Sequence, residues 1–143
     1  MREKVIMNDL KNIVNIAARS EAATKVYGKE DTLVRALDGV DVSFESGKFS
    51  AIMGPSGSGK STLMHCMAGL DNLSSGKVFI GNTDLTELSE KELTLLRRSN
   101  IGFIFQSFNL VPTLNALENI TLPIDLSGNK IDKDWVDQIT EVV

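Results

Sequence analysis

The sequence has few of the residues that build disulfide frameworks or metal sites, with one cysteine (Cys66) and one histidine (His65). A single cysteine cannot form an internal disulfide, and this fits a reducing compartment. No run approaches 18 consecutive apolar residues, so no segment predicts a membrane-spanning helix. The first ten residues are rich in charge and lack the apolar core of a signal peptide. Together these absences predict a cytoplasmic chain.

Basic residues are too few to indicate nucleic acid as the main partner. The chain has 15 Lys and Arg against 19 Asp and Glu, which gives a net charge of −4, and it has no basic stripe. A hydrophobic content of 42% and a charged content of 24% over 143 residues are typical of one small, soluble, globular domain.

One stretch, residues 54–61, carries the strongest functional signal. It reads Gly-Pro-Ser-Gly-Ser-Gly-Lys-Ser and fits the G-x-x-x-x-G-K-[ST] pattern of a phosphate-binding P-loop. Its glycines let the backbone approach an anion closely, and successive N–H groups form a nest for phosphate oxygens. Lys60 can reach the β- and γ-phosphates, and the Ser61 hydroxyl can bind Mg²⁺. The predicted nucleotide-binding residues here are Gly54, Pro55, Ser56, Gly57, Ser58, Gly59, Lys60, Ser61 and Thr62.

The surrounding residues favour a P-loop over a flexible Gly/Ser turn. Residues 49–53 are mostly apolar and predict a buried strand. After the loop, apolar residues recur on one predicted helical face, and Gly69 stands where a helix C-cap would be. The residues of that face are Leu63, Met64, Met67 and Ala68. Strand, glycine-rich loop and helix follow one another as they do in a P-loop unit.

The N-terminal third predicts antiparallel strands. Residues 34–37 and 40–44 flank Asp38-Gly39, a dipeptide typical of hairpin turns. Residues 45–48 predict another turn, and residues 15–21 show a weaker strand pattern. Residues 1–12 are polar and predict a loose lead-in to a domain that covers residues 13–143.

After the P-loop helix, residues 78–80 predict a short strand and residues 101–105 a buried one. Ser89 and Glu92 have the spacing of a capping box, which predicts a helix ending near Arg98.

Two further helices are predicted near the end of the sequence. One begins around Asn115 and is expected to be closed by Pro123. The other follows Asp132, which is a candidate N-cap. Its apolar residues recur at helical spacing and are Trp135, Val136, Ile139, Val142 and Val143.

Together these residues resemble the ATP-binding subunit of an ABC transporter, and most closely that of the lipoprotein-release and macrolide-export systems. The resemblance runs from about Ile16 to the last residue. It is carried by residues 25–28, 36–40, 51–63, 102–110 and 117–120. It implies an α/β fold in which a parallel P-loop ATPase core is flanked by an antiparallel β region and a helical region.

The resemblance also implies roles for two residues outside the P-loop. In the family, an aromatic residue at the position of Tyr27 stacks on adenine. A glutamine at the position of Gln106 touches Mg²⁺ and the attacking water, and relays the nucleotide state to the membrane subunit. Lys60 and Gln106 are therefore the expected catalytic residues, and Ser61 and Gln106 the expected contacts of Mg²⁺.

The cofactors that the resemblance implies are ATP and Mg²⁺. The implied partners are a membrane permease subunit or domain and a second ATP-binding subunit, with ATP held between the two. We therefore expect a cytoplasmic protein that is peripheral on the inner face of the cell membrane.

Several family motifs are missing from the sequence. No apolar run ends in Asp-Glu, the pair that supplies the Mg²⁺-holding aspartate and the catalytic glutamate in the family. No Leu-Ser-Gly-Gly-Gln signature occurs: residues 126–128 begin like one but continue Asn129-Lys130. No switch histidine follows. His65 and Cys66 lie in the predicted P-loop helix, where packing explains them better than catalysis.

Three interpretations stay open at this point. The chain represents the N-terminal portion of an ATP-hydrolysing subunit, or a binding-only fragment, or a different P-loop enzyme such as a kinase or GTPase. For the third we find no acceptor site or base-reading motif. The first two imply a fold truncated before the signature and the Asp-Glu (Walker B) strand, and they predict that these 143 residues alone do not turn ATP over.

Overall fold

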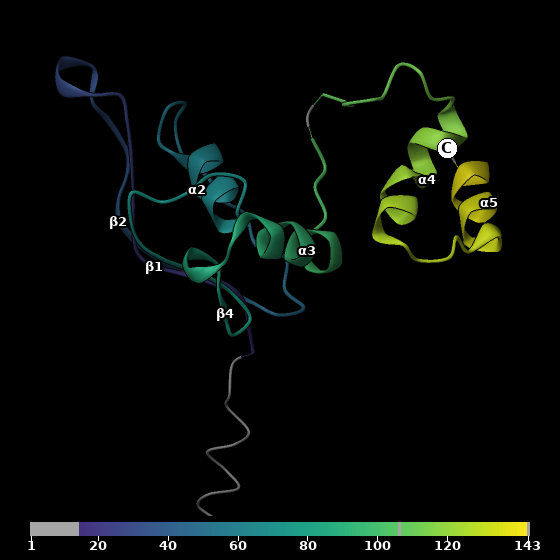
Figure 1. Ribbon diagram of the computed structural model, residues 1–143, viewed down its shortest axis with the longest axis horizontal. Helices are drawn as coiled ribbons and strands as arrows, with labels where there is room; N and C mark the ends of the chain where they lie inside the picture. The colour runs from purple at the N-terminus through teal and green to yellow at the C-terminus, as the bar shows by residue number, and fades with distance from the viewer. Residues whose placement is uncertain (1–14, 106, 143) are drawn as a thin grey trace, which may run out of the picture. The chain divides into compact units, whose positions relative to one another are not determined.

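The computed structural model describes residues 15–105 and 107–142, and the chain divides into two compact units, residues 1–93 and 94–143. The predicted lead-in over residues 1–12 lies outside the described residues. The first unit holds strands β1 (Ile16–Tyr27), β2 (Val34–Glu45), β3 (Ser75–Ile80) and β4 (Thr83–Asp84), with helix α2 (Lys60–Met67) (Figure 1). It also holds the short 3₁₀ turns η2 (Glu30–Thr32) and η3 (Leu85–Glu87).

The four strands form one antiparallel sheet in the order β2-β1-β3-β4. Strand β1 is central: Arg19 lies opposite Ser43 of β2 on one side and Phe79 of β3 on the other. The Arg19 guanidinium lies 3.6 Å from the centre of the Phe79 ring, which is a cation–π contact across the sheet. The predicted antiparallel arrangement is confirmed, and β1 extends six residues further than its predicted end, to Tyr27.

The predicted hairpin at Asp38-Gly39 is wrong, because both residues lie inside β2. The chain reverses instead between β1 and β2, around η2. Gly39 has φ 62°, and its N–H donates to the Thr24 hydroxyl at 3.0 Å. The pairing register between β1 and β2 shifts at this point. Gly39 therefore serves a β-bulge, which uses the same positive φ that a hairpin turn would.

The two predicted buried strands, residues 49–53 and 101–105, are also wrong. Neither segment is a strand, and Phe49 is 97% exposed and Ile104 102%. A buried strand needs neighbouring strands to satisfy its backbone groups. Within the described residues the sheet is antiparallel and pairs with neither segment. The parallel core sheet that the resemblance implies is therefore absent from this part of the fold.

Helix α2 packs against β1, β2 and β3. Its buried side chains are Leu63, Cys66 and Met67, and Ala68 follows at the C-cap. Met64 was predicted to lie on the packed face but is 53% exposed. Cys66 takes that place, because it lies at helical spacing from Leu63 and packs beside Met67. Gly69 ends the helix as predicted: it has φ 64°, and its N–H donates to the Cys66 carbonyl at 3.0 Å.

The capping box predicted for the next helix is confirmed. Helix α3 covers Glu90–Asn100, two residues beyond its expected end. The Ser89 N–H donates to Glu92 Oε2 at 2.8 Å, and the Glu92 N–H donates to Ser89 Oγ at 3.4 Å. Leu93 from α3 is buried in the core of the first unit, together with Ala23, Leu37, Val78 and Leu85.

The second unit contains α4 (Ala116–Ser127) and α5 (Lys133–Val142). Pro123 was expected to close α4 but lies inside it, and the helix ends at Gly128 with φ 74°. A proline within a helix removes one backbone hydrogen bond, whereas glycine supplies the left-handed C-cap conformation. Asp132 caps α5 as predicted, because the Trp135 N–H donates to its Oδ1 at 3.1 Å.

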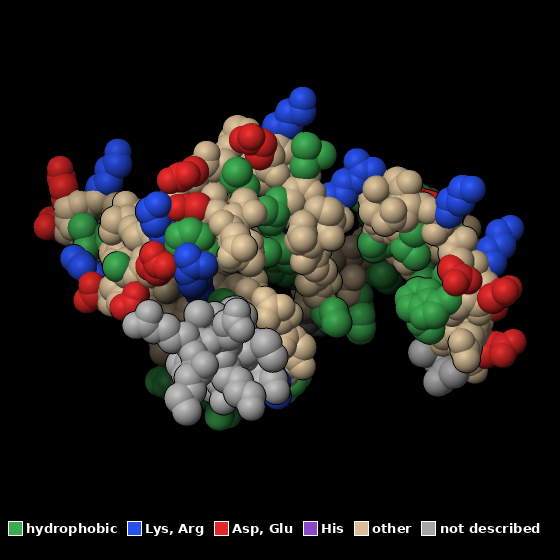
Figure 2. All heavy atoms as spheres, turned by 90° about the horizontal axis from the view of Figure 1, so that it is seen from below, with side chains coloured by type: hydrophobic (Ala, Val, Ile, Leu, Met, Phe, Trp, Pro, Cys, Tyr) green, Lys and Arg blue, Asp and Glu red, His purple; other side chains and the backbone are tan. Residues whose placement is uncertain are grey.

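Hydrophobic side chains remain on the surface, where they lie among acidic and basic ones (Figure 2). Over the described part of the chain, no helix has the length and apolar character needed to cross a lipid bilayer.

Candidate functional site

The loop before α2 has the backbone that the P-loop pattern predicts. Gly57 has φ 79° and Gly59 has φ 86°, and both values lie in the left-handed region that favours glycine. Gly59 is also the N-cap of α2. A Cβ atom at Gly59 would lie 2.3 Å from the carbonyl oxygen of Ala36 in β2. The loop is therefore held against the sheet at a distance that only glycine permits.

The start of α2 offers backbone donors to an anion. Its first hydrogen bond runs from the Leu63 N–H to the Gly59 carbonyl at 2.8 Å. The amides of residues 60–62 precede that bond and so have no acceptor within the helix. They lie at the positive end of the helix dipole. Residues 56–62 line an open hollow of about 520 Å³, and this arrangement fits phosphate groups.

Lys60 brings a positive charge into this loop. Its Nζ donates to the carbonyl oxygens of Gly54 at 2.9 Å and Pro55 at 2.6 Å, and to Ser58 Oγ at 3.3 Å. All three acceptors belong to the loop itself. The structure thus places Lys60 at the hollow, where its ammonium group can exchange these acceptors for phosphate oxygens.

Of the two residues predicted to contact magnesium, the structure describes Ser61 but not Gln106. Ser61 is the second residue of α2 and lines the hollow. Gln106 lies outside the described residues, so its roles stay predictions. Across residues 15–105 and 107–142, no group of three or more His, Cys, Asp or Glu could hold a metal ion. A single hydroxyl still fits Mg²⁺, which keeps several waters and takes its other ligands from substrate phosphates.

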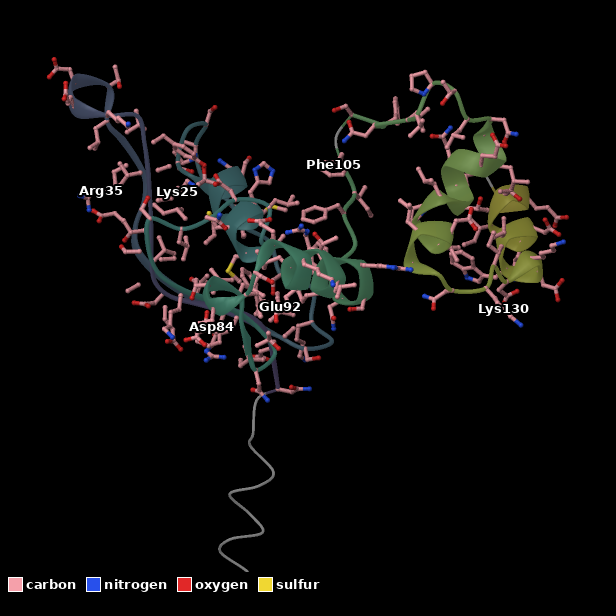
Figure 3. All side chains as sticks on the ribbon, in the orientation of Figure 1. Lys25, Arg35, Asp84, Glu92, Phe105 and Lys130 are labelled. Atoms are coloured by element: carbon pink, nitrogen blue, oxygen red, sulfur yellow. The ribbon has the colours of Figure 1, made fainter. Side chains whose placement is uncertain are left out.

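Tyr27, the predicted adenine contact, lies at the end of β1 in a hydrogen-bonded cluster. Its hydroxyl donates to Asp71 Oδ2 at 2.6 Å, and Lys25 Nζ donates to Oδ1 of the same carboxylate. The Lys25 ammonium lies 4.9 Å from the centre of the Tyr27 ring, and Lys25 projects from β1 in the region of α2 (Figure 3). The Tyr27 side chain is 41% exposed.

Charges within this cluster shift three pKa values. The hydrogen bond from Lys25, followed by that from Tyr27, lowers the pKa of Asp71. The hydrogen bond to Asp71 raises the pKa values of both Lys25 and Tyr27. The Thr62 side chain has a smaller, opposite effect on the pKa of Tyr27, which places Tyr27 beside the end of the P-loop. At neutral pH the cluster is therefore an ion pair with a neutral phenol.

Sequence reasoning missed Asp71 and Lys25. Lys25 could have been found, because it lies two residues before Tyr27 and so projects from the same face of the strand. Nothing local indicated Asp71, which lies 44 residues from its partner Tyr27.

The expectation that Cys66 packs is confirmed: the residue is 3% exposed, and burial raises the pKa of its thiol. His65 is exposed on α2.

Comparison with known proteins agrees with this geometry. A family model described as "ABC transporter" matches residues 37–143. The chain is 46% identical to an uncharacterized ABC transporter ATP-binding protein of Methanocaldococcus jannaschii, over 71% of this chain and 43% of the relative. It is 44% identical to the lipoprotein-releasing system ATP-binding protein LolD of Blochmanniella floridana, over 74% of this chain and 45% of the relative.

Other similar proteins include an exporter and a solved cassette. The chain is 44% identical to the macrolide export ATP-binding/permease protein MacB of Bdellovibrio bacteriovorus, over 83% of this chain and 18% of that one. A dimeric post-hydrolysis structure of the ATP-binding cassette MJ0796, bound to ADP and Pi, matches with a TM-score of 0.74 at 40% identity. That match covers 82% of this chain and 51% of the other.

The chain thus spans less than half the length of these three sequence relatives. The family model nevertheless matches well over half of the chain and includes the P-loop, α2 and every helix after it. By its sequence and by its fold, the chain belongs to the ABC transporter family and is similar to part of an ATP-binding cassette.

Proposed function

We propose that this chain binds ATP with Mg²⁺ as part of a cassette that energises a membrane exporter. The observation that carries the proposal is the P-loop at the start of α2, with the Lys60 ammonium held inside the loop by Gly54 and Pro55. Family membership supports ATP as the nucleotide. The names of the similar MacB and LolD proteins support export as the process.

In the proposed complex, the loop amides and Lys60 hold the triphosphate, Ser61 binds Mg²⁺, and the Tyr27 ring stacks on adenine. Mg²⁺ held by Ser61 would neutralise part of the phosphate charge. Gln106 is proposed as a further contact of Mg²⁺ and of the attacking water.

The proposed partners are a membrane permease subunit or domain and a second ATP-binding subunit. Support for the second subunit comes from the dimeric cassette to which this fold is similar. These partners would hold the protein on the inner face of the cell membrane.

Titration with a fluorescent ATP analogue tests the nucleotide site. Lys60→Ala is expected to weaken binding more than Tyr27→Ala, because Lys60 meets concentrated negative charge whereas ring stacking contributes about 1 kcal/mol. Lys91→Ala is the matched control, since it removes an exposed lysine of α3 outside the loop. Equal losses for Lys60→Ala and Tyr27→Ala, or a larger loss for Tyr27→Ala, would contradict the assignment.

A further inference from the structure

One polar cluster beside the P-loop has no role in the phosphate binding proposed above. It consists of Lys25, Tyr27 and Asp71, and all three residues belong to the first unit. Each oxygen of the Asp71 carboxylate accepts a hydrogen bond from a different side chain of β1: Oδ1 from Lys25 and Oδ2 from Tyr27, the latter at 2.6 Å. Asp71 itself lies in the loop that follows α2.

These contacts fix the Tyr27 ring before any ligand arrives. A tyrosine ring free in solvent rotates about two side-chain bonds, and the hydrogen bond to Asp71 anchors its far end. The Lys25 ammonium, 4.9 Å from the ring centre, covers one face. Tyr27 as a whole residue is still 41% exposed. A planar group can therefore stack on the face away from Lys25 without the entropic cost of ordering the ring.

The cluster also avoids an electrostatic penalty. An isolated carboxylate beside the P-loop would repel a triphosphate by Coulomb interaction. Lys25 pairs with Asp71, and the ion pair therefore adds no net charge. Asp71 can thus orient the tyrosine while leaving the positive potential of the loop intact.

We propose that Asp71 is a positioning residue for the purine base: its hydrogen bond holds the Tyr27 ring in the orientation that stacks on the base, and Lys25 is its counter-charge. This inference rests on the nucleotide-binding function proposed above, and it assigns base affinity to a residue that contacts neither the base nor the phosphates.

Two ligands separate base binding from phosphate binding in the 143-residue chain: Mg·ATP and inorganic tripolyphosphate with Mg²⁺. Because Asp71→Ala leaves the Lys25 charge unpaired, both polyanions gain the same Coulomb attraction. The affinity for ATP relative to that for tripolyphosphate is therefore the readout, and it is expected to fall about fivefold, the loss of one aromatic stacking contact. Asp71→Asn keeps an oxygen acceptor for the Tyr27 hydroxyl and is expected to retain most of the ATP affinity. Asp31→Ala, at an exposed carboxylate in η2, is the matched control.

The sole tyrosine of the sequence allows a direct spectroscopic readout. With ring-labelled tyrosine, ATP is expected to shift the Tyr27 ring signals in the NMR spectrum, whereas tripolyphosphate is expected to leave them in place. The Asp71→Ala variant is expected to show a smaller ATP-dependent shift. Equal changes in the affinities for both ligands on Asp71→Ala would show that Asp71 does not act on base binding and would overturn the inference. Failure of the unaltered chain to bind either ligand would instead reject the nucleotide site itself.

Discussion

The ion pair between Lys25 and Asp71 links β1 to the loop after α2, so its protonation affects stability. The pKa of Asp71 is lowered in the folded state by the hydrogen bonds from Lys25 and Tyr27. Its contribution is therefore present above the unfolded carboxyl pKa, about 3.9, and is lost as the pH falls through the lowered value. The pKa values of Lys25 and Tyr27 are raised, chiefly by Asp71. Their contribution is present below about pH 10 and is lost as the pH rises through the raised values.

We therefore expect the free energy of unfolding to fall at both ends of the pH range, and Asp71→Asn to flatten the acid limb. Urea unfolding at a series of pH values measures this, with Asp31→Asn as a control at an exposed carboxylate. Acid limbs of equal slope in Asp71→Asn and the unaltered chain would show that the cluster is not linked to folding.

Gly59 illustrates a second constraint at the residue scale. Alanine at Gly57 would meet no atom within 4 Å, whereas alanine at Gly59 would place Cβ 2.3 Å from the Ala36 carbonyl oxygen. Both substitutions incur the cost of a left-handed conformation, about 1–2 kcal/mol. Gly59→Ala is expected to cost more than that, because the backbone of β2 must also move. Thermal or urea melts of the two variants compare them directly, and equal destabilisation would refute the close approach.

The proposed phosphate site was predictable from sequence, whereas the cluster around Tyr27 was not. The P-loop is contiguous, so a local pattern specifies its glycines, Lys60 and Ser61 together. Asp71 reaches Tyr27 only after α2 has packed on the sheet and the chain has turned at Gly69. A contact between residues 44 positions apart has no local signature in a single sequence.

At the scale of elements, Asn119 connects α4 to the loop before it. Its Nδ2 donates to the carbonyls of Val111, Leu114 and Asn115 at 3.3, 3.0 and 2.9 Å, and its Oδ1 accepts from the Val111 N–H at 2.8 Å. Because one amide side chain contacts four backbone groups, Asn119→Ala is expected to cost about 1–2 kcal/mol of local stability and to release this loop.

Hydrogen–deuterium exchange over residues 107–120 measures that release, alongside circular dichroism to confirm that α4 persists. Asn129→Ala is the matched control, since this exposed asparagine lies in the same unit beyond α4. Unchanged exchange of the Val111 amide in Asn119→Ala would mean that the side chain does not hold the loop.

Helix starts were predicted more accurately than strands, because caps are local and strand pairing is not. Ser89 and Asp132 cap the expected helices through contacts within three residues. Residues 49–53 and 101–105 have the composition of buried strands, but a strand forms only when a neighbour accepts its hydrogen bonds. Gly39 correctly predicted a backbone position with positive φ. Whether that position forms a hairpin turn or a β-bulge depends on the pairing with β1, which the local sequence does not contain.

At the scale of the whole molecule, the 143-residue chain is expected to bind ATP without turning it over. Phosphoryl transfer to water needs positioning, charge neutralisation and an oriented nucleophile. The P-loop supplies the first two in part, but the sequence has no Asp-Glu strand end and no Leu-Ser-Gly-Gly-Gln signature. Loss of a positioned base alone typically lowers a rate by about 10²–10⁴.

Phosphate release from Mg·ATP by the purified chain measures this, with Lys60→Ala as the blank. Sustained turnover above the blank would indicate that a carboxylate of this chain acts as the base, and Glu118 and Asp125 would be the first candidates to substitute.

The sheet of the first unit has a consequence for how the protein is made. All four strands lie between Ile16 and Asp84, and the P-loop and α2 lie between β2 and β3. Translation proceeds at roughly 5–20 residues per second, so residues 85–143 take on the order of 3 to 12 s to synthesise. During that interval β3 can already pair with β1, and α2 can pack against both strands. A nascent chain on the ribosome can thus assemble the proposed phosphate-binding loop before α4 and α5 have emerged from the ribosome.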